Sequence, residues 1–164
     1  MTAGRQDTTR VFRLSERLTK LAPDPWIEDA EGGRWFQVDA KALAVLERFI
    51  LRDLHGREVA SLRQRELRGE NATDIERQGA TVATVRRVRA GLRHHFVIDV
   101  QNRMSLDVHG QVGRHEYEIR RDREVIATVS ERWFRTPRTY GVEIAPDEDE
   151  AMILAATIAL EAMN

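Results

Sequence analysis

The chain has 164 residues, with 26 Lys plus Arg against 27 Asp plus Glu, so its formal net charge is −1. This length fits one domain, and a content of 41% hydrophobic and 32% charged residues excludes both a disordered tail and a membrane-embedded protein. There is no Cys, which excludes a disulfide scaffold, a thiolate zinc site and a Cys nucleophile. Because residues 1–10 are polar, we expect no secretory signal and a cytoplasmic protein.

Residues 1–9 are predicted to form a loose tail, and residues 10–164 a single domain. From residue 10 to about Pro146, short runs with alternating polarity lie between turn signals; Phe96, Ile98 and Val100, for example, share one face of such a run. The turn signals are residues 31–33, 53–56, 78–79, 101–103, 107–110 and 121–123. Many short strands between regular turns are typical of an antiparallel sandwich or barrel.

Residues 40–54 fit two patterns. Leu43, Leu46 and Ile50 have helical spacing, whereas Leu43, Phe49 and Leu51 have the even spacing of a strand. Local propensity alone favours a helix here.

A weak repeat links residues 56–62, 79–85 and 123–129, in which a turn leads into a strand with Ala at its centre. A small residue there indicates that something packs closely against the sheet. We expect a positive φ at Gly56 and Gly79, because two-residue hairpin turns demand it. Arg123, which replaces the turn glycine in the third copy, should show a longer loop or a left-handed residue.

The C-terminal segment, residues 147–163, is predicted to be a helix. Asp147 is the expected N-cap, with Glu150 three residues on, and the four acids of residues 147–150 suit the positive end of a helix dipole. Residues 151–160 are apolar except for Thr157, so the helix must be covered on every side. It is too short for a bilayer, which takes about 20 apolar residues, and a helix enclosed by a closed barrel satisfies both conditions.

The polar residues give little support to catalysis or to metal binding. His94 and His95 are adjacent, so in a strand they point to opposite faces and cannot both reach one ion. The pair His115 and Glu116 could supply a general base, which keeps an enzyme as the weakest alternative. No glycine pattern matches a phosphate-binding loop, and the acidic run lacks the spacing of a calcium loop. We therefore assign no catalytic, cofactor-binding or metal-binding residue and expect no cofactor.

Charge patterning gives the one functional indication. Residues 77–95 contain five Arg and two His with no acid. Such a stretch can hold the phosphates of lipid headgroups or of nucleic acid, although the near-zero net charge argues against nucleic acid and favours an ordinary solvated face. Strand parity predicts an outward row of three arginines with Val88 turned to the core. The candidate residues for anionic lipid are Arg86, Arg87, Arg89 and Arg93, of which all but Arg86 belong to that row.

Several segments carry a family resemblance in a fixed order along the chain, from about Phe12 to Met163. These segments are residues 23–29, 38–43, 49–53, 56–60, 107–110, 115–118, 133–135 and 140–144, followed by the apolar C-terminal helix. Together they resemble the LURP-one-related family of the tubby C-terminal-like group. The resemblance implies a twelve-stranded antiparallel barrel around the C-terminal helix, and strand rather than helix at residues 40–54. Relatives in the wider group include phosphoinositide-binding tubby proteins and phospholipid scramblases.

We therefore predict a non-enzymatic binding or scaffolding module with a protein partner or an anionic phospholipid as its ligand. The first alternative is a peripheral membrane protein that binds anionic headgroups through the four arginines. The second is an enzyme that uses His115 and Glu116. No transmembrane segment is expected.

Overall fold

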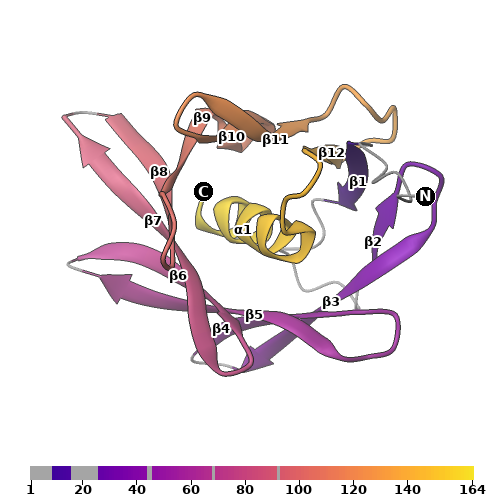
Figure 1. Ribbon diagram of the computed structural model, residues 1–164, viewed down its shortest axis with the longest axis horizontal. Helices are drawn as coiled ribbons and strands as arrows, with labels where there is room; N and C mark the ends of the chain where they lie inside the picture. Colours follow the sequence, from indigo (N-terminus) through magenta and orange to yellow (C-terminus); the bar gives the residue numbers. More distant parts are fainter. Residues whose placement is uncertain (1–8, 16–25, 44–45, 68, 92) are drawn as a thin grey trace, which may run out of the picture.

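A computed structural model describes residues 9–15, 26–43, 46–67, 69–91 and 93–164 of the chain. Twelve antiparallel strands close into a barrel, and one helix lies inside the ring that they form (Figure 1). The strands are β1 (Arg10–Ser15), β2 (Trp26–Asp29), β3 (Arg34–Leu43), β4 (Leu46–Arg52), β5 (Glu58–Leu67), β6 (Glu70–Arg77), β7 (Ala80–Ala90), β8 (Arg93–Val100), β9 (Leu106–Gln111), β10 (Glu116–Arg121), β11 (Glu124–Ser130) and β12 (Thr139–Ile144). A 3-10 turn, η2 (Val112–Arg114), precedes β10, and the helix is α1 (Glu150–Met163).

The strands follow one another around the barrel in chain order, and β1 closes the ring by pairing with β12. This confirms the predicted closed barrel around the C-terminal helix. The tail predicted at residues 1–9 lies, up to residue 8, outside the described residues.

Within the segment of residues 40–54, residues 40–43 belong to β3 and residues 46–52 to β4, so the strand implied by the family resemblance is correct. The helix favoured by local propensity is wrong. In the observed register Val38 lies opposite Leu51 and Ala40 opposite Phe49. Phe49 and Leu51 are buried in the core, as is Val38. Cross-strand pairing on both sides of β4 and burial of its even-spaced face therefore override local propensity.

The turns of the first two repeat copies agree in part with the predicted conformation. Gly56 and Gly79 have φ of 76° and 77°, as predicted. Only Gly79 lies in a two-residue hairpin turn, because Arg77 pairs with Ala80. The turn before β5 is longer, and the Asp53 carboxylate accepts hydrogen bonds from two of its backbone N–H groups.

In the third copy of the repeat the prediction for Arg123 is wrong. The turn has the same two-residue length, since Arg121 pairs with Glu124. The left-handed residue is Asp122, with φ of 57°, one position earlier than predicted. Aspartate tolerates this conformation better than most residues, because its short side chain can hydrogen-bond locally.

Helix α1 is enclosed as the sequence predicts. Ten consecutive residues, 151–160, are buried, and the helix packs against β5, β6, β7 and β12. The side chain of Thr157, the one polar residue among them, donates to the backbone carbonyl of Ile153 at 2.9 Å, so the apolar interior leaves no hydroxyl unpaired there. Ala60 and Ala83, the centres of two repeat copies, are fully buried in this core. Small residues at these positions allow the helix to approach the wall.

The helix is capped two residues later than predicted. Asp149, not Asp147, is the N-cap, and its side chain accepts from the Met152 N–H at 3.1 Å. Asp147 instead lies in the preceding turn with φ of 66°. The acids around this end are bound by arginines from the barrel rim. These pairs are Arg77 with Asp149, Arg121 with Glu148 (2.7 Å) and Arg10 with Glu150 (3.2 Å).

Shortening a buried side chain of the helix should destabilise the whole barrel. Leu154 and Ile158 are both 0% exposed, so replacing either by Ala leaves a cavity that should lower the free energy of unfolding by about 2–5 kcal/mol. Urea denaturation followed by circular dichroism measures this loss. Leu54→Ala, at a side chain that is 59% exposed, is the matched control and should change stability by less than about 0.5 kcal/mol. Equal losses in core and control variants would contradict the enclosed helix.

Candidate functional site

The basic segment lies on the β7–β8 hairpin, but not as one outward row. Ala83 and Val85 of β7 are buried in the core, and Arg87 has the same strand parity. Arg87 lies opposite Phe96, which is also a core residue. Arg87 therefore faces inward, whereas Val88 has the outward parity. The predicted outward row of Arg87, Arg89 and Arg93, with Val88 turned to the core, is therefore wrong.

Arg87 caps the end of the central helix. Its Nη2 donates to the carbonyl oxygen of Met163, in the last turn of α1, and its guanidinium lies 5.3 Å from the centroid of the Phe96 ring. A cation here satisfies a carbonyl that has no partner within the helix and opposes the negative end of the helix dipole. Its Nε is buried and has no hydrogen-bond partner among the described residues.

The other three predicted lipid-binding residues, Arg86, Arg89 and Arg93, do not share one environment. Arg86 faces outward and donates to Asp99 of β8 at 2.5 Å, and Ser105 donates to the same carboxylate at 3.0 Å. Partial burial raises the pKa of Asp99, but these two hydrogen bonds and the Arg86 charge outweigh it, so the pKa is lowered. Arg89 is exposed. Arg93 begins β8, and its side chain lies outside the description. The structure thus separates the four arginines, and their binding to lipid stays a prediction.

The β7–β8 hairpin separates from its neighbouring strands toward its turn, and we call residues 87–96 the arm. The last pair between β6 and β7 in this direction is Ala72 with Arg86. On the other side, β8 pairs with β9 only at Val97 with Asp107 and at Ile98 with Leu106. The described residues of the arm therefore have β-pairing only within their own hairpin, and the wall of the barrel opens on both sides of the arm.

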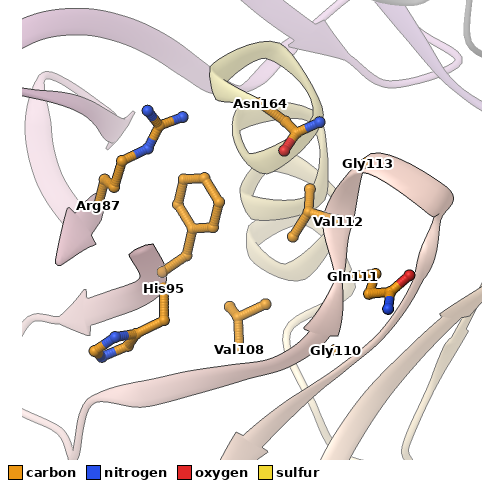
Figure 2. A pocket seen from close by; sticks show the side chains of 9 residues that line it. Arg87, His95, Val108, Gly110, Gln111, Val112, Gly113 and Asn164 are labelled. Atoms are coloured by element: carbon orange, nitrogen blue, oxygen red, sulfur yellow. The ribbon is translucent and has the colours of Figure 1, made fainter. Parts of the chain in front are cut away.

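Each opening is a hollow in the surface. The hollow between the arm and β9 has a volume of about 380 Å³, and Figure 2 shows Arg87 and His95 on one side of it and the stretch from Gly110 to Gly113 on the other. Asn164, which follows the helix, forms its upper edge in this view. The hollow toward β6 has a volume of about 700 Å³ and includes Glu70 and Asp99 beside three arginines. The positive charge is therefore partly balanced in the second hollow.

A buried polar cluster links the barrel wall to the last turn of α1. The Nδ1 atom of His115 lies 2.7 Å from Oε2 of Glu161, and the phenol of Tyr117 donates to Oε1 of the same carboxylate at 2.9 Å. The His115 ring stacks on Tyr140 with 4.5 Å between centroids. Sequence reasoning missed Glu161 and Tyr117; the one signal for them was an acid at the end of an otherwise apolar helix.

The two residues of the enzyme alternative do not converge. His115 ends η2 in a left-handed conformation, with φ of 51°, and contacts Glu161 inside the barrel. Glu116 instead accepts from the Ser130 hydroxyl at 2.9 Å on the outer side of the wall. Neither side chain lines either hollow beside the arm.

Within the ranges that the structure describes, no group of three or more His, Cys, Asp or Glu residues could hold a metal ion. The acidic run before α1 is bound instead by the rim arginines. No helix in the described part of the chain is long and apolar enough to span a membrane.

A closed antiparallel barrel around a C-terminal helix is consistent with the tubby C-terminal-like group of β-barrel proteins. The chain belongs to the LURP-one-related family, whose family model matches residues 10–161. The X-ray structure of an Arabidopsis thaliana protein has the same fold, with a TM-score of 0.69 and 15% sequence identity over 94% of this chain and 91% of that one. No curated protein matches the sequence.

The buried phenol predicts a loss of stability at alkaline pH. Burial, with the charge of Glu161, raises the pKa of Tyr117 well above its usual value. Above the unfolded pKa of about 10, the unfolded chain loses this proton while the folded chain keeps it, so rising pH favours unfolding. Urea midpoints should therefore fall more steeply above about pH 10 for the wild type than for Tyr117→Phe. Parallel curves for the two proteins would show that this phenol does not contribute.

Proposed function

We propose that this chain is a non-enzymatic binding or scaffolding module that holds its ligand at the barrel end where α1 terminates. One observation carries the proposal: the helix fills the barrel. Leu154, Ala155 and Ile158 are 0% exposed, so the helix takes the central place in the barrel that an internal ligand would otherwise occupy. The hollows beside the arm lie at the end of the helix instead.

The roles of the ionisable groups support binding rather than catalysis. Arg65 pairs with Asp74 across neighbouring strands at 2.6 Å, Arg86 pairs with Asp99, and Arg87 caps the helix. These contacts hold the wall and the helix together. General acid–base catalysis would instead need a titratable group directed at a substrate.

Affinity purification tests this function. We expect the protein, used as bait in an extract of its source cells, to retain the same proteins or lipids in replicate experiments. An unrelated bait protein of equal size should not retain them. A retained small molecule should be recovered unchanged after incubation with the purified protein. Product that forms at a rate proportional to protein concentration would overturn the non-enzymatic function, and so would failure to retain any molecule.

A second candidate is peripheral binding to anionic membranes, which the charge of the arm favours. Residues 87–96 contain three Arg and two His and no acid, and the arm is not paired with the strands on either side. Each basic residue near an anionic surface contributes about 1 kcal/mol, so the binding should be weak and sensitive to salt.

Vesicle sedimentation distinguishes this candidate. The double substitution Arg89→Glu with Arg93→Glu should abolish sedimentation with vesicles that contain phosphatidylserine. Arg86 and Arg87 stay unchanged in this test, because both have structural partners. The control, Arg103→Glu with Arg123→Glu, makes the same charge change at two exposed turn residues and should sediment like the wild type. If the wild type fails to sediment at low salt, the membrane function is wrong.

A further inference from the structure

The hollow between the arm and β9 occupies the place of missing strand pairs. If the observed β8–β9 register continued, Phe96 would lie opposite Val108 and His95 opposite His109. These pairs are absent, as are the two that would follow them. Each strand instead pairs on its other side: residues 93–96 with β7, and residues 108–111 with β10.

Two strand edges of four residues therefore face one gap. An unpaired edge presents backbone N–H and C=O groups that can pair with a further strand. Extended peptides bind other proteins through such edges, where the main chain supplies affinity and the side chains supply specificity. The volume of about 380 Å³ is within the range of about 300–1,000 Å³ that is usual for ligand sites.

The lining of the gap selects the charge of the occupant. Phe96, Val108 and Val112 give it an apolar part, whereas Arg87 and His95 stand on the arm side. None of the nine lining side chains is acidic. Arg87 lines the gap, so its guanidinium, which has several N–H donors, can donate to a carboxylate that enters the gap.

We propose that the gap between β8 and β9 binds an extended acidic peptide as an added strand. This inference rests on the proposed binding function and names its partner class. Alternating acidic and apolar side chains fit the gap, because successive strand residues point to opposite faces. A lipid headgroup would match the charge but would leave the unpaired backbone N–H and C=O groups of the two strand edges without partners.

Three labelled probe peptides test the proposal with the full-length protein by fluorescence anisotropy. The first is an eight-residue peptide of alternating Val and Glu. The second has Lys in place of Glu, and the third keeps the acids but is N-methylated at every second backbone nitrogen. We expect the Lys peptide and the N-methylated peptide each to bind at least about tenfold more weakly than the first.

A matched pair of variants locates the site. Gln111→Glu places a negative charge in the gap with little change in shape and should weaken binding of the acidic peptide about fivefold or more. Gln101→Glu makes the same change in the exposed turn at the opposite end of β8 and should bind like the wild type. Melting temperatures of both variants should match the wild type, because both side chains are exposed.

The outcomes separate this proposal from the general one. If the three peptides bind equally, or if Gln111→Glu binds as tightly as Gln101→Glu, strand addition in the gap is overturned. Sedimentation with anionic vesicles but no peptide binding would also overturn it and would favour the membrane candidate. In either case, a ligand that affinity purification retains unchanged would leave the binding-module function in place.

Discussion

The need to enclose a helix that is apolar on every side determines the rest of this structure. Residues 151–160 cannot face water, and a twelve-stranded closed wall covers them completely. A buried helix has two ends that expose unpaired backbone groups, and both must find partners. The Asp149 side chain supplies one at the N-terminal end, and Arg87 reaches in from β7 to supply one at the other.

The positions of the arginines follow from this constraint more than from net charge. Arg10, Arg77 and Arg121 come from three distant strands and bind the acids at the start of the helix. Ion pairs at an exposed surface contribute little individually, about 0–1 kcal/mol, but these three connect the wall to the helix at one rim. Arg86, by contrast, pairs with Asp99 across neighbouring strands on the outer face. One residue type therefore serves two structural purposes, which composition alone cannot separate.

The opening of the wall is also tied to the helix end. Pairing between β8 and β9 ceases where residues from η2, and Asn164 just after α1, line the gap (Figure 2). Closure of the gap by further β8–β9 pairs would bring Phe96 against Val108 and remove the space beside the Arg87 guanidinium. The binding surface that we propose is thus a consequence of where the helix stops inside the barrel.

The sequence by itself determined the parts that depend on local pattern: alternating strands, a positive φ at Gly79, and a C-terminal helix that must be buried. Tertiary structure decided residues 40–54, where pairing on both sides of β4 overrode helix propensity. It also decided the direction of Arg87. The sequence shows that Arg87 has the same parity as Val85. An inward-facing arginine is stable only if a hydrogen-bond acceptor lies inside the barrel, and the sequence does not show one. That acceptor is a helix carbonyl 76 residues away. Glu161 was hidden in the same way, because its partners, His115 and Tyr117, lie on another element. Local periodicity indicates which residues share a face, whereas the partner that makes a buried charge tolerable is brought in only by the fold.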